Sequence, residues 1–124
     1  MNGNPSNLIL LVEDDPDIAT LLGAVLRRAD FEHCWAATAQ TGWQLALERS
    51  PAAVVLDIDL PDFSGIELCR RLKADSRTAN LPVIFCSGCA EARHHALAAG
   101  GLDFLDKPDG IFDLPERLRK VLHR

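Results

Sequence analysis

Five short segments rich in apolar residues constrain the fold of this 124-residue chain more than any other feature. None exceeds six residues, and each is followed by a longer segment in which apolar residues return at helical spacing. Strands that alternate with helices form a parallel sheet covered by helices on both faces. We therefore predict an α/β fold with strands at Leu8–Val12, His33–Ala37, Ala53–Asp57, Leu81–Cys86 and Leu102–Leu105.

The segments that follow these strands are predicted to be helices. Asp15 precedes Pro16, and an acidic cap before a proline favours a helix start. Asp113 and Glu116 predict a capped start of the last helix in a similar way, whereas Gly42 interrupts the second helical segment. We predict helices from Pro16 to about Asp30, from Thr38 to Arg49, from Ile66 to Lys73, from Ala90 to Ala99 and from Asp113 to Leu122.

The composition is that of one globular domain, with 48% apolar and 25% charged residues. The net charge of −5 disfavours direct nucleic-acid binding and attachment to an anionic membrane. Residues 1–7 contain neither the basic residue nor the apolar core of a signal peptide. We expect a disordered tail over 1–7, a single domain over 8–124, and a cytoplasmic location.

Reactive side chains follow four of the predicted strands. They are Glu13 and Asp14 after the first strand, Asp57 at the end of the third, Ser87 after the fourth and Lys107 after the fifth. Parallel sheets bind ligands beyond the carboxyl ends of their strands. Clustered carboxylates suit Mg²⁺, a carboxylate can form an acyl phosphate, and an ammonium group can neutralise a transferring phosphoryl group. This set of residues predicts phosphorylation of an aspartate.

Four motifs in one order carry a family resemblance. They are ILLVEDDPDI at 9–18, VVLDIDLPDFSGIEL at 54–68, LPVIFCSG at 81–88 and DFLDKP at 103–108. From about Leu8 to Leu122 the chain resembles the receiver domain of two-component response regulators, of the chemotaxis-receiver type. The resemblance implies a flavodoxin-like (βα)5 three-layer sandwich with a parallel five-stranded sheet of order 2-1-3-4-5.

The resemblance also implies a role for each matching residue. Asp57 would be the phosphoacceptor and carry 4-aspartylphosphate. Ser87 and Lys107 would bind the phosphate oxygens, and Ser87 and Phe104 would change position when the switch is set. The magnesium ligands would be Glu13, Asp14, Asp57 and the backbone carbonyl of Asp59. Loop structure would depend on Pro61, Gly65 and Pro108, with a cis bond before Pro108.

The implied function is a signalling switch rather than an enzyme with a separate substrate. A histidine kinase or a histidine phosphotransfer protein would donate the phosphoryl group, and phosphorylation would change the surface presented to an unidentified output protein. No nucleic acid or membrane would be bound directly, and self-association would be a weak homodimer at most. Three features depart from the pattern of the family. Phe104 replaces the commoner tyrosine, and residues 109–111 lengthen the link to the last helix. The resemblance also implies that the acidic side chain of Asp59 would affect the lifetime of the phosphoryl group.

Three alternatives remain open. Asp57-Ile58-Asp59 also resembles the nucleophile motif of haloacid-dehalogenase-type phosphatases, in which the second aspartate is a general acid. A receiver-like module that binds partners without phosphorylation is the second. Cys86 and Cys89 form a C-x-x-C pair, which is half of a zinc site or a redox pair, although Cys34 and Cys69 are isolated. We expect all four cysteines to be reduced thiols.

Overall fold

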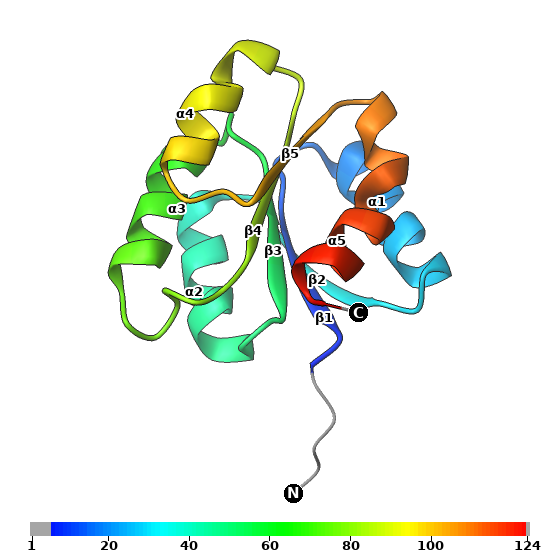
Figure 1. The fold of residues 1–124 in the computed structure, drawn as a ribbon, viewed down its shortest axis with the longest axis horizontal. Helices are drawn as coiled ribbons and strands as arrows, with labels where there is room; N and C mark the ends of the chain where they lie inside the picture. Colours follow the sequence, from blue (N-terminus) through cyan, green and yellow to red (C-terminus); the bar gives the residue numbers. More distant parts are fainter. Residues whose placement is uncertain (1–5, 124) are drawn as a thin grey trace, which may run out of the picture.

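The computed structural model describes residues 6–123, so residues 1–5 of the predicted tail and Arg124 lie outside the described part. Helices and strands alternate along the chain (Figure 1). The strands are β1 (Leu8–Val12), β2 (Glu32–Ala36), β3 (Ala53–Leu56), β4 (Val83–Ser87) and β5 (Asp103–Asp106). The α-helices are α1 (Pro16–Arg28), α2 (Ala39–Arg49), α3 (Gly65–Ala74), α4 (Arg93–Ala98) and α5 (Leu114–Val121), and two 3₁₀-helices are η1 (Ala90–Ala92) and η2 (Asp109–Asp113).

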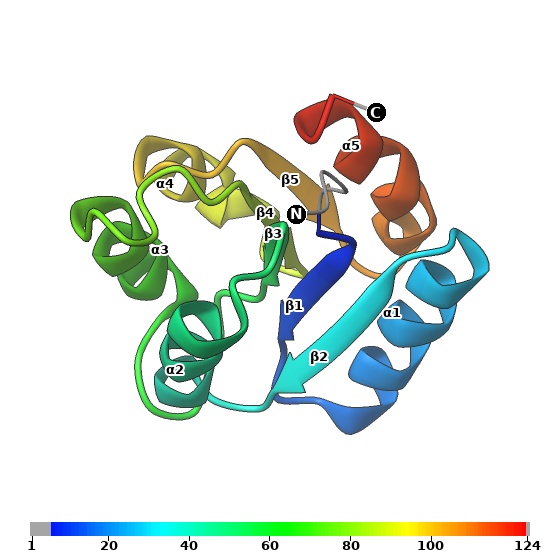
Figure 2. The ribbon, with the colours of Figure 1, turned by 90° about the horizontal axis from the view of Figure 1, so that it is seen from below.

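The strands form one parallel sheet in the order β2-β1-β3-β4-β5, which confirms the predicted flavodoxin-like topology. Helices α1 and α5 cover one face, and α2, α3 and α4 cover the other (Figure 2). Because β1 and β3 are neighbours in the middle of the sheet, the residues that follow them meet at one edge.

The core has two halves, one on each face of the sheet. Ile9 and Leu11 of β1 belong to the cluster that includes Leu22 of α1 and Leu118 of α5. Their neighbours Leu10 and Val12 belong to the opposite cluster, with Leu68 and Leu72 of α3 among its members. Alternate side chains of a strand point to opposite faces, so a strand buried on both faces is apolar throughout.

Local sequence accounts for the start of α1 and the tight packing of α2. The Asp15 carboxylate accepts hydrogen bonds from the N–H groups of Asp17 and Ile18, as the sequence predicts. Gly42 lies inside α2, where an added Cβ would stand 2.9 Å from Cγ2 of Val12. The glycine that interrupts the helical pattern therefore allows α2 to pack closely on β1.

The start of α5 differs from the prediction. Asp113 precedes the helix but its side chain makes no capping hydrogen bond, because η2 leads directly into α5 and holds Asp113 in a helical conformation. The predicted helix over 90–99 is divided into η1 and the short α4, and the bounds of every strand except β1 differ from the prediction by one or two residues. None of the helices over residues 6–123 combines the length and apolar character of a membrane span.

Candidate functional site

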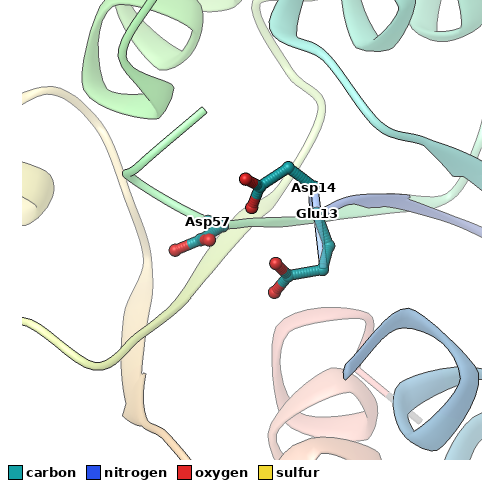
Figure 3. A group of neighbouring side chains, drawn as sticks. All are labelled: Glu13, Asp14 and Asp57. Carbon is teal, nitrogen blue, oxygen red and sulfur yellow. The ribbon is translucent and has the colours of Figure 1, made fainter. Parts of the chain in front are cut away.

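Three acidic side chains meet beyond the carboxyl ends of β1 and β3. Oxygens of Glu13, Asp14 and Asp57 lie within 4.8 Å of one another, and Figure 3 shows the side chains converging. Glu13 is 2% exposed and Asp57 is 7% exposed, whereas Asp14 is exposed to solvent. The cluster therefore has a buried side and an open side.

Main-chain hydrogen bonds continue the sheet to these acids. The N–H of Asp57 donates to the carbonyl of Val12 at 3.0 Å, and the N–H of Glu13 donates to the carbonyl of Ala36 at 3.0 Å. The side chains are also held, since Oδ1 of Asp57 accepts from the N–H of Ile58 at 2.8 Å and Oε2 of Glu13 accepts from the N–H of Asp15 at 3.1 Å. These contacts fix the two buried carboxylates before any ligand arrives.

Lys107 completes the group from beyond β5. Its Nζ lies 2.5 Å from Oε1 of Glu13 and 3.2 Å from Oδ2 of Asp57. Burial raises the pKa of Glu13 in spite of the hydrogen bond from Lys107. Burial alone would lower the pKa of Lys107, but its hydrogen bond to Glu13 and the negative charge of Asp57 raise it. Lys107 is therefore a cation shared by two buried carboxylates.

The donor set fits a hard divalent cation. Three carboxylates face one ammonium group, so within residues 6–123 the cluster holds more negative charge than its own lysine balances. All the candidate side-chain ligands are oxygens, and the exposure of Asp14 leaves room for water and a phosphate oxygen. Magnesium prefers this combination of a few carboxylates with retained water.

Ser87 lies at the same edge of the sheet. It is fully buried as the last residue of β4, and its carbonyl accepts a hydrogen bond from the N–H of Lys107 at 3.0 Å. Its Oγ accepts from the N–H of Cys89 at 3.1 Å, which leaves the hydroxyl hydrogen to serve as a donor. The peptide bond between Lys107 and Pro108 is cis, as the resemblance predicts.

Gly65 packs against the main chain of Asp57. An added Cβ at Gly65 would stand 1.9 Å from the Asp57 carbonyl oxygen, and the N–H of Gly65 donates to the carbonyl of Ile58 at 2.9 Å. The start of α3 is therefore seated on the predicted acceptor. Asp59 and Pro61 are exposed in the intervening loop, where the role of the Asp59 carbonyl stays a prediction.

Phe104 is buried in β5, with 3% of its surface exposed. Nη1 of Arg93 donates to its carbonyl oxygen at 3.2 Å, and the Arg93 guanidinium lies 5.7 Å from the centre of its ring. Arg93 thus joins α4 to the strand that carries the predicted switch residue. The sequence offers no local pattern that would have revealed this contact.

Two further residues near the site also escaped sequence reasoning. The indole N–H of Trp35 donates to the Glu13 carbonyl at 2.6 Å. The Asp62 carboxylate accepts from the N–H groups of Ala39 and Gln40, at 2.9 and 2.8 Å, and these bonds hold its pKa below the usual range against the effect of desolvation. Asp62 thereby ties the loop after Asp57 to α2 by a contact between residues far apart in the chain.

The C-x-x-C pair takes no part in this group. All four cysteines are free, and burial raises the pKa of Cys86 to about 12. Among the described residues, the group arranged to hold a metal ion is the acidic cluster, which contains no cysteine.

Comparison with known proteins places the chain in a family. Residues 9–119 match the family model of the response regulator receiver domain. The KDP operon transcriptional regulatory protein KdpE of Escherichia coli is 39% identical over 118 residues, a match that covers 94% of this chain and 51% of KdpE. The chain thus spans about half the length of such regulators.

Two solved structures share the fold over almost the whole chain. A putative response regulator from Chloroflexus aurantiacus is 31% identical, with a TM-score of 0.90, covering 97% of this chain and 100% of that one. The receiver domain of the sensor histidine kinase PA1611 from Pseudomonas aeruginosa is 26% identical, with a TM-score of 0.87 and the same coverage, and that structure holds a magnesium ion in its active-site cleft. With the matching family model and the sheet order, these likenesses establish that the chain belongs to the response regulator receiver domains of two-component systems.

Proposed function

We propose that this receiver domain is a phosphoryl-accepting switch in which Asp57 takes a phosphoryl group in a magnesium-dependent step. The observation that carries the proposal is the arrangement around Asp57, with Lys107 Nζ at 3.2 Å and oxygens of Glu13 and Asp14 within 4.8 Å. The donor would be a phosphohistidine of a histidine kinase or of a histidine phosphotransfer protein.

The transfer exchanges one bond to phosphorus for another. A carboxylate oxygen of Asp57 forms the new bond while the phosphorus–nitrogen bond of the donor breaks and the imidazole nitrogen keeps the electron pair. Bound Mg²⁺, held by Glu13, Asp14, Asp57 and the Asp59 carbonyl, would supply positive charge to the phosphoryl oxygens. The Lys107 ammonium would move from the carboxylates to a phosphate oxygen, and the Ser87 hydroxyl would donate to another.

The output would be a change in the surface formed by α4 and β5. Ser87 ends β4 and Lys107 directly follows β5. Strand β5 also carries Phe104, whose carbonyl contacts Arg93 of α4. Movement of Lys107 and Ser87 toward phosphate would therefore reach α4 and change what a partner meets. In this proposal the domain assists its own phosphorylation and dephosphorylation and turns over no separate substrate.

Intact-mass measurement after incubation with acetyl phosphate and Mg²⁺ tests the proposal. We expect one phosphoryl adduct on the wild type and on Asp59→Asn, and none on Asp57→Asn or in the presence of a chelator. Labelling of Asp57→Asn would refute the assignment. Multiple turnover of a phosphomonoester would instead support the phosphatase alternative. A protein that takes up no phosphoryl group and binds no beryllofluoride would support the module that works without phosphorylation.

A further inference from the structure

Trp35 is an exposed aromatic side chain whose ring N–H is bonded to the main chain of the acidic cluster. It lies near the end of β2, an edge strand of the sheet, and 45% of its surface is exposed. The edge of the indole is nevertheless bound, because its N–H donates to the Glu13 carbonyl oxygen at 2.6 Å. The side chain therefore contributes a directed hydrogen bond at the acidic cluster in addition to apolar surface.

This bond completes a clamp on the main chain of Glu13. The N–H of Glu13 donates to the carbonyl of Ala36, and its carbonyl accepts from Trp35, so β2 holds both sides of the residue. The Glu13 side chain is fixed separately by Lys107 and by the N–H of Asp15. Both the main chain and the side chain of Glu13 are therefore held in one conformation.

The clamped carbonyl also belongs to the peptide unit that leads into Asp14. A peptide unit is planar, so a hydrogen bond that fixes the Glu13 oxygen also fixes the direction of the Asp14 N–H and Cα. Asp14 is the exposed member of the cluster, and within residues 6–123 its carboxylate makes no hydrogen bond or ion pair. The main chain therefore sets the point from which the Asp14 side chain extends toward the cluster.

From these contacts we propose that Trp35 is a positioning residue for the magnesium site. Its indole N–H orients the Glu13–Asp14 peptide so that the Asp14 carboxylate faces Glu13 and Asp57 before the ion binds. The inference rests on the proposed function, because it concerns the same metal. Groups that orient a ligand from outside the coordination shell commonly change metal affinity strongly.

Magnesium titrations followed by backbone amide chemical shifts test this role without any phosphorylation step. Trp35→Phe removes the N–H, and replacement of Trp35 by 3-benzothienyl-alanine removes it while the shape of the ring system is kept. Trp43→Phe, in α2, is the matched control. We expect the dissociation constant for Mg²⁺ to rise about three- to tenfold in both Trp35 variants, the range expected for loss of one hydrogen bond, and to stay unchanged in Trp43→Phe.

The outcomes separate this inference from the proposed function. Equal magnesium affinity of the wild type and the benzothienyl variant would overturn the role of Trp35 and leave the proposed function standing. Failure of the wild type to bind Mg²⁺ would overturn both. A second expected result is that the variants need more Mg²⁺ for half-maximal labelling by acetyl phosphate but reach the wild-type rate at saturation, and a lower saturated rate alone would contradict a positioning role.

Discussion

At the scale of single residues, Glu13 and Asp57 are negative charges largely withdrawn from water and dependent on one lysine. Burying an ion costs several kcal/mol or more in principle, and a partner at hydrogen-bond distance offsets only part of that cost. Lys107 serves both carboxylates, at 2.5 and 3.2 Å. These buried charges therefore lower the stability of the unliganded domain, and they are arranged to bind a cation or a phosphoryl group.

Glu13→Gln is expected to stabilise the magnesium-free protein at pH 7.5. Burial raises the pKa of Glu13 above its ordinary value of 4.5, so the folded state binds a proton more readily than the unfolded state. The cost of the charged Glu13 is thus fully present above the folded-state pKa and disappears as pH falls through it toward 4.5. Thermal unfolding at several pH values should show the advantage of the variant shrinking as pH falls.

Two comparisons make the Glu13 prediction specific. Glu48→Gln, an exposed change in α2, should leave both the unfolding temperature and its pH dependence unaltered. Adding Mg²⁺ should stabilise the wild type and have less effect on Glu13→Gln, because a ligand that binds only the folded state raises its stability. A Glu13→Gln protein that melts below the wild type at pH 7.5 would contradict this account of the site.

At the scale of elements, α3 is seated against the predicted acceptor. The helix begins at Gly65, whose missing side chain lets the backbone approach the Asp57 carbonyl. Ser64 caps this helix by accepting from the N–H of Ile66, and Asp62 joins the same loop to α2. The loop after β3 is therefore held from both sides and fixes the main chain around Asp57.

Gly65→Ala should be among the most harmful single changes in the domain. Its Cβ would stand 1.9 Å from a backbone oxygen that cannot rotate away, so we expect a loss of about 3 kcal/mol or more in the free energy of unfolding. Gly88→Ala is the matched control, because nothing lies within 4 Å of its added Cβ. Urea unfolding of the two variants checks the prediction. Equal free energies of unfolding would contradict the close contact between Gly65 and the Asp57 carbonyl.

At the scale of the whole molecule, most of the fold could be predicted from the sequence because its signals are local. Strands buried on both faces, such as Leu8–Val12, are short and apolar throughout, and helices α1, α3 and α5 show clear periodicity. Alternation of the two elements then leaves few topologies. The cluster of Glu13, Asp14, Asp57 and Lys107 follows from that topology, since residues after parallel strands meet at one edge.

The features that sequence reasoning missed depend on contacts between distant residues. Trp35 and Glu13 are 22 positions apart, and Asp62 caps a helix that begins 23 positions earlier. Asp113 was predicted to cap α5 from a local motif, but η2 imposes a different backbone conformation. Local patterns identify elements and the residues at their ends, whereas cross-chain hydrogen bonds appear only when the elements are packed.

The most direct test of the central claim is to locate the phosphorylated residue chemically. Borohydride reduces an acyl phosphate to an alcohol, so a phosphorylated aspartate becomes homoserine, which peptide mass spectrometry can assign to a position. After incubation with acetyl phosphate and Mg²⁺, we predict homoserine at position 57 and at no other aspartate. Homoserine at Asp14 or Asp59, or its absence from a protein that carries a phosphoryl adduct, would contradict the assignment of Asp57 as the acceptor.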